Sequence, residues 1–160
     1  NGIAGLNLAA TIQRQNDLHQ SAADGDLGFA GEVPDANGDL IEAHARYTTG
    51  GLQLTVQHAR WDIDSDAAEA LGKDQQEGTM FEAGYRIGDQ WGVFARHTTV
   101  DTNAGSEDAN DEETVVVTGG VNYWPHERVV VKADYQDFDY KSDAGDDGES
   151  RFNLGLGWSF

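Results

Sequence analysis

Cysteine is absent from the 160-residue chain, which excludes both a disulfide framework and a metal site built from thiolates. Proline occurs twice, whereas glycine occurs 20 times. No stretch approaches the roughly 18 consecutive apolar residues that a membrane-spanning helix needs. A composition rich in glycine and poor in proline, without long apolar runs, suits an all-β protein with many short strands.

Positive charge is also scarce, because 10 Lys and Arg residues stand against 29 Asp and Glu residues and give a formal net charge of -19. Such acidity argues against nucleic-acid binding, which needs a basic surface. The chain has no nucleophile elbow, no glycine-rich phosphate loop and no cluster of residues that indicates catalysis. We therefore predict a protein that is not an enzyme, binds no nucleic acid and uses no cofactor.

Eight segments alternate with a period of two between apolar residues and polar or small ones, as strands with two different faces do. Valine, threonine and aromatic residues are frequent in these segments, which supports the strand prediction. One short turn of helix is expected at 66–71, inside a loop. The predicted strands are Ile3–Gln13, Leu40–Tyr47, Leu52–Trp61, Thr79–Ile87, Trp91–Val100, Thr114–Tyr123, Arg128–Phe138 and Arg151–Phe160.

The connections between these strands alternate between short and long. In an antiparallel meander, this order places all the long loops at one end and all the short turns at the other. The long loops hold 23 of the 29 acidic residues and three of the ten basic residues, so the acidity belongs to one end of the molecule. The short turns are 48–51, 88–90 and 125–127, and the long loops are 14–39, 62–78, 101–113 and 139–150.

The two faces of the predicted strands differ in chemistry. One face is apolar, with aromatic residues near the short turns, where the aromatic girdle of a membrane barrel lies. The other face carries glycines and charges of both signs, as the lining of a barrel lumen does. The predicted interfacial aromatics are Tyr47, Tyr85, Trp91, Tyr123, Trp158 and Phe160, and the predicted pore-lining residues are Glu42, Arg46, Glu82, Arg86, Arg96, Lys132 and Asp134.

A soluble sandwich would produce the same alternation, with the apolar face turned inward. The order of long loops and short turns, the position of the aromatics and the paired charges on the polar face favour a transmembrane β-barrel instead. In that interpretation lipid contacts the apolar face, and the last strand descends to the inner interface of the membrane.

The end of the chain carries a family resemblance. A last strand, "FNLGLGWSF", that alternates and ends on Phe160 resembles the signal by which Gram-negative outer-membrane proteins are assembled. Together with "GGVNYWPHERVVVKADYQDFDY" it resembles the C-terminal part of phosphate-selective porins of the OprO/OprP kind, best over residues 114–160. "GYRIGDQWGVFARHT" is similar to a porin hairpin, and residues 1–60 match in pattern alone.

The resemblance implies sixteen strands per protomer, homotrimers, and contact with outer-membrane lipid and lipopolysaccharide. Residues 1–160 supply eight strands, so we expect either the C-terminal half of such a porin or a small barrel closed on its own. The family's ladders of anion-binding lysines and arginines are not evident here, and phosphate selectivity is therefore not carried over. The expected function is an outer-membrane channel through which small hydrophilic solutes or ions diffuse.

Two alternatives stay open beside the channel. A closed eight-stranded barrel would fill its interior with salt bridges and act as a structural, adhesive or receptor protein through its acidic loops. A soluble acidic sandwich would be a binding module. Clustered carboxylates at Asp143, Asp146 and Asp147 raise the question of calcium, but they lack the ordered spacing of an EF-hand loop, so no metal site is predicted.

Overall fold

The computed structural model describes residues 2–16, 36–70, 72–105, 113–141, 145 and 147–159. Asp143, Asp146 and Phe160 lie outside these described residues. The described residues form one sheet of eight strands and one short helix, α2, at Asp66–Ala70. The strands are β1 Leu6–Gln15, β2 Asn37–Thr49, β3 Leu52–Asp64, β4 Gln75–Ile87, β5 Trp91–Asp101, β6 Glu113–His126, β7 Val129–Lys141 and β8 Asp147–Trp158.

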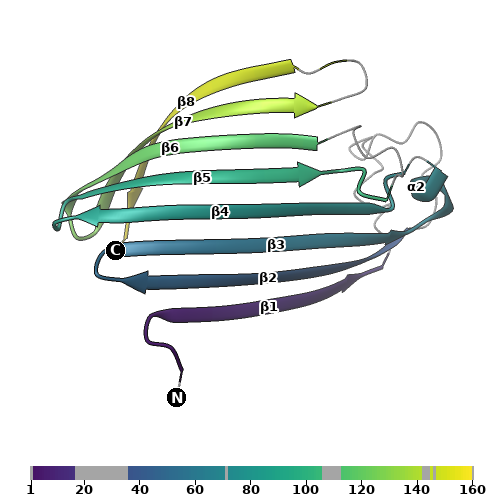
Figure 1. Ribbon diagram of the computed structural model, residues 1–160, viewed down its shortest axis with the longest axis horizontal. Coiled ribbons are helices and arrows are strands. Elements are labelled where there is room, and N and C mark those ends of the chain that lie inside the picture. Colours follow the sequence, from purple (N-terminus) through teal and green to yellow (C-terminus); the bar gives the residue numbers. More distant parts are fainter. Residues whose placement is uncertain are drawn as a thin grey trace.

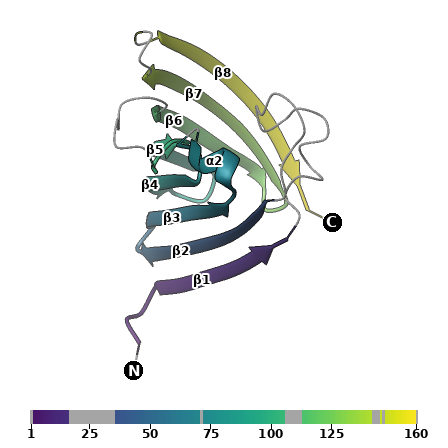
Figure 2. The same ribbon diagram turned by 90° about the vertical axis from the view of Figure 1, so that its right-hand side faces the viewer.

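Each strand pairs antiparallel with the next, in the order β1 to β8, so the predicted up-and-down meander is confirmed. The short turns lie at one end of the sheet, and α2 lies at the other (Figure 1). The sheet bends into an open trough (Figure 2). Within the described residues β1 pairs with β2 alone and β8 with β7 alone, so the sheet is not closed into a barrel.

Most strands extend further toward the long loops than the sequence pattern indicated. Strand β3 continues to Asp64 and β7 to Lys141, although the alternation of apolar residues ends earlier on both. Side-chain contacts add to the backbone pairing in these extensions: the Arg60 guanidinium donates to Asp62 on β3, and the Tyr140 hydroxyl on β7 donates to Glu149 on β8. Several acidic residues that were assigned to loops therefore lie on strands, among them Asp62 and Glu149. The short helix expected at 66–71 is present as α2.

Glycine permits the tight turns at the opposite end of the sheet. Gly50 and Gly51 link β2 to β3 with φ of 52° and 90°, and Gly88 opens the turn after β4 with φ of 62°. Side chains with a Cβ rarely adopt this left-handed conformation. The turns therefore stay short, and they hold the register between neighbouring strands.

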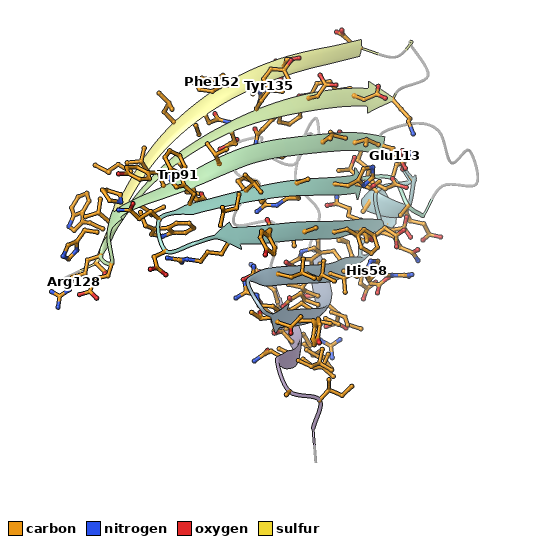
Figure 3. All side chains as sticks on the ribbon, turned by 60° about the vertical axis from the view of Figure 1, so that its left-hand side comes forward. His58, Trp91, Glu113, Arg128, Tyr135 and Phe152 are labelled. Carbon is orange, nitrogen blue, oxygen red and sulfur yellow. The ribbon has the colours of Figure 1, made fainter. Side chains whose placement is uncertain are left out.

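The described residues form no apolar core. The buried ones among them are small: Ala36, Gly38, Ala68, Gly92 and Thr118. The large apolar side chains project instead from the convex side, where Tyr135 and Phe152 lie (Figure 3). Ile12 is 79% exposed, Leu154 72% and Phe152 66%. No helix within the described part of the chain is long and apolar enough to cross a membrane.

Candidate functional site on the concave face

All seven residues predicted to line a pore lie on the same, concave face of the sheet. Residues paired across an antiparallel ladder point to the same side. The register joins Arg46, Thr55, Glu82, Arg96 and Thr118 into one row across five strands. The remaining four predicted residues follow at even spacing along these strands or on β7, namely Glu42, Arg86, Lys132 and Asp134.

The charges on this polar face differ in how they are paired. Arg96 donates from Nε and Nη2 to the Glu82 Oε2 atom, at 2.9 and 2.5 Å. Asn153 donates to the Asp134 carboxylate at 2.9 Å. Arg46 and Lys132, in contrast, are exposed and form no ion pair with any described residue. Two cations on the concave face thus depend on water, or on a ligand, for their solvation.

Two aromatic side chains also lie on the polar face, each against a glycine of the neighbouring strand. Phe94 faces Gly120, where an added Cβ would sit 2.5 Å from the Phe94 Cε1 atom. Trp124 covers Gly92, where an added Cβ would sit 3.0 Å from the Trp124 Cζ3 atom. The glycines therefore let both rings lie against the backbone, and the Arg86 guanidinium stacks 4.2 Å from the centre of the Trp124 ring.

These groups surround a hollow of about 370 Å³ on the polar face, toward the short turns. Its walls come from β2 to β7, which places side chains from distant parts of the sequence around one space. Lys132 and Arg96 lie 5.8 and 5.9 Å from the centre of the Phe94 ring. Three cations and one carboxylate border the hollow, so it is positively charged within a strongly acidic protein.

The charge of the polar face reverses toward the long loops. There the carboxylates are Glu42, whose Oε1 lies 2.9 Å from His44 Nδ1, and Glu149, which is paired with Arg151. The Tyr140 hydroxyl donates to Glu149 at 2.7 Å. This hydrogen bond stabilises the carboxylate and, with Arg151, lowers the pKa of Glu149, while the same bond raises the pKa of Tyr140. Both residues lie beyond the apolar segments of β7 and β8.

The convex face carries what we call the apolar belt, three or four alternating residues on each strand. The five described aromatics that were predicted for a membrane interface all lie in this belt, and the rings of Trp91 and Tyr123 contact each other at a tilt, with centres 4.5 Å apart. The belt consists of Leu6, Leu8, Ala10, Ile12, Ile41, Ala43, Ala45, Tyr47, Leu52, Leu54, Val56, Phe81, Ala83, Tyr85, Ile87, Trp91, Val93, Ala95, Val115, Val117, Val121, Tyr123, Val129, Val131, Ala133, Tyr135, Phe152, Leu154, Leu156 and Trp158.

The apolar belt crosses the sheet obliquely. On β1 it runs from Leu6, nearest the short turns, to Ile12, and on β8 it runs from Phe152 to Trp158, nearest the short turns. The line of register partners that starts at Leu6 reaches Phe152 on β8. The belt has therefore moved by six residues along the strands between β1 and β8, while keeping the same width.

The described residues contain no group of three His, Asp or Glu side chains placed to hold a metal ion. Of the three acidic residues considered for calcium, the described one is Asp147, at the start of β8. Its Oδ1 atom accepts a hydrogen bond from the backbone N–H of Gly148 at 2.8 Å. This contact orders the beginning of the strand.

The sequence analysis missed several residues of the polar face. Phe94 and Trp124 were overlooked because aromatics were sought among the apolar positions alone. An aromatic residue at a polar position, opposite a glycine on the next strand, is the signal that would have identified Phe94. Arg151 and the aromatic side chains at the long-loop border of the belt, Phe81, Tyr135 and Phe152, were not singled out for function.

No protein family matches this chain. A search of curated proteins likewise finds no match.

Proposed function

We propose that the protein is a β-barrel of the Gram-negative outer membrane and forms a channel for the passive diffusion of small hydrophilic solutes or ions. The apolar belt carries the membrane part of the proposal. Four residues spaced two apart span about 20 Å along a strand, close to the apolar band of about 25 Å on outer-membrane barrels. Aromatic residues border it on both sides, as in an interfacial girdle.

The slope of the apolar belt supports the same conclusion. A shift of six residues corresponds to about 20 Å along the strands, over seven strand spacings of about 4.8 Å each. A membrane parallel to this belt would be crossed by strands tilted by about 30°, near the 35–45° of membrane barrels. A soluble sandwich would need a second layer on the convex face, and none covers it among the described residues.

The two unpaired cations carry the channel part of the proposal. A narrow closed barrel excludes water from its interior, so a charge inside it must be paired or lose several kcal/mol of solvation. Arg46 and Lys132 have no carboxylate partner among the described residues. Both are compatible with a wide lumen filled with water, where they would act on passing ions.

Single-channel recording in planar bilayers, with protein purified in detergent, tests the channel. We expect stepwise conductance, and we expect Arg46→Glu to shift the reversal potential toward cations. Arg14→Glu is the matched control, because Arg14 lies on the neighbouring strand beyond the belt and pairs with Asp39 at 3.4 Å. Protein that inserts into the bilayer without ever conducting would overturn the channel.

The second candidate is a closed eight-stranded barrel with a structural, adhesive or receptor role. The oblique belt favours it in one respect, since pairing Trp158 with Leu6 would join the two ends of the belt within one chain. Native mass in detergent separates the candidates: a single eight-stranded chain supports the narrow barrel, and a trimer of sixteen-stranded protomers supports the porin. Lipid and lipopolysaccharide are the partners in both proposals.

A further inference from the structure

We infer that the hollow on the polar face is a binding subsite for a planar organic anion, a carboxylate attached to an aromatic or similarly flat apolar group. The inference rests on the proposed channel, whose solutes it would narrow to this class. Three independent features of the hollow converge on the same ligand: excess positive charge, a half-buried aromatic ring and an unsatisfied amide.

The positive charge is concentrated and partly free. Of the three cations at the hollow, Arg96 is bound to Glu82, and Asp89 engages Arg86 through its backbone oxygen, at 2.6 Å, rather than through a carboxylate. Lys132 forms no ion pair with a described residue. Glu82 is the one carboxylate in the lining, so the hollow has an excess of two positive charges. Charge-assisted hydrogen bonds from such groups favour an anion strongly.

The Phe94 ring gives the hollow an apolar surface. Gly120 leaves room for the ring to lie against the sheet, with Arg96 and Lys132 at similar distances from its centre. A flat apolar group can stack on this ring while its carboxylate reaches the cations on either side. An inorganic anion would use the cations and leave the ring without a role.

Asn122 supplies the third feature. Its Oδ1 atom is buried and has no hydrogen-bond partner among the described residues. The residue lines the hollow beside Lys132 on the next strand. The oxygen and nitrogen of a carboxamide exchange places by a half-turn of the group. A bound carboxylate would accept a hydrogen bond from the Asn122 amide nitrogen and thereby give this side chain a partner.

Isothermal titration of the protein in detergent tests the subsite directly, with sodium benzoate as the probe and with sodium phosphate and benzyl alcohol for comparison at equal ionic strength. We expect benzoate to bind about tenfold more tightly than either, because it alone uses both the charge and the ring. Lys132→Gln and Phe94→Leu should each weaken benzoate binding, Lys132→Gln by about tenfold. Phosphate binding as tight as that of benzoate would overturn the inference.

Two further variants keep the test clear of folding defects. Arg46→Gln removes a cation of the same polar face that does not border the hollow, and should leave benzoate binding unchanged. Asn122→Asp keeps the shape of the side chain and should abolish binding. Equal losses in Arg46→Gln and Lys132→Gln would indicate general electrostatic attraction and overturn the subsite. Because the titration needs no channel, binding without conductance rejects the channel alone, and conductance without benzoate binding rejects the subsite alone.

Discussion

At the scale of single residues, two adjacent glycines on β6 have different surroundings. An added Cβ at Gly120 would sit 2.5 Å from the Phe94 ring and 2.9 Å from the backbone oxygen of Ala133. An added Cβ at Gly119 would meet nothing within 4 Å. Side chains alternate between the faces, so Gly120 lies under a ring on the concave face, whereas Gly119 lies in the convex one.

We therefore predict that Gly120→Ala destabilises the protein by about 1–3 kcal/mol, because the ring and the backbone must both shift. Gly119→Ala is the matched control and should change the free energy of unfolding by less than about 0.5 kcal/mol. Urea-induced unfolding in detergent or lipid vesicles, followed by tryptophan fluorescence, measures both. Equal effects of the two substitutions would show that the Phe94 ring does not lie against Gly120.

We expect the Glu82 carboxylate to influence the ion selectivity of the proposed channel more than the free energy of unfolding. Its pair with Arg96 is partly exposed, so Glu82→Gln should cost at most about 1 kcal/mol of unfolding free energy. The same change removes the one carboxylate of the hollow and should shift the reversal potential of the channel toward anions. Glu127→Gln, at the exposed turn between β6 and β7, is the control that should leave the reversal potential in place.

At the scale of a strand, the two faces of β8 should respond oppositely to charge. Leu154 lies in the apolar belt, whereas Asn153 lies on the polar face and donates to Asp134. Leu154→Arg should destabilise the protein in lipid vesicles by about 2–4 kcal/mol, and Asn153→Arg by far less. Reversible unfolding in urea from vesicles measures the difference. Equal costs at both positions would contradict contact between lipid and the convex face.

The oblique belt makes a second prediction for the strands. Leu8 and Ser150 lie on the same line of register partners, yet Leu8 lies within the belt and Ser150 beyond it. Spin labels attached at these two positions in vesicles should differ in the reagent that reaches them. Oxygen, which dissolves in lipid, should reach the label at Leu8 more readily, and a water-soluble nickel reagent should reach the label at Ser150 more readily. Labels at Ile12 and Phe152, both at the long-loop border, should report similar depths. Equal depths at Leu8 and Ser150 would place the strands parallel to the membrane normal.

How much of the strand arrangement follows from the sequence depends on the face considered. Alternation predicted all eight strands, because a period of two is visible wherever one face is apolar. The ends of β3 and β7 were predicted too short, because the large apolar residues change face there, to Trp61 and Ile63 on β3 and to Phe138 and Tyr140 on β7. The polar face was predicted residue by residue, yet contacts such as Phe94 on Gly120 depend on register, which alternation within one strand does not encode.

At the scale of the whole molecule, the acidic composition favours solubility in water, whereas the apolar belt opposes it. The net charge of -19 favours solubility in water. The apolar surface area that side chains expose on the convex face is far larger than the patches of a few hundred Å² found on soluble monomers. We predict that the protein stays monodisperse in detergent and precipitates when detergent is removed, as size-exclusion chromatography would show. A stable, monodisperse protein in plain buffer would favour the soluble sandwich.

The open edges of the sheet set a condition on how the protein reaches a membrane. A free edge as long as β8 leaves roughly six N–H and six C=O groups without partners, and each would cost several kcal/mol in hydrocarbon. In water the same groups form a template on which a second chain can add. An unsealed sheet is thus disfavoured in both solvents. If the sheet enters a bilayer as proposed, the edges at β1 and β8 must therefore gain pairing partners in the same step, either from each other or from further strands.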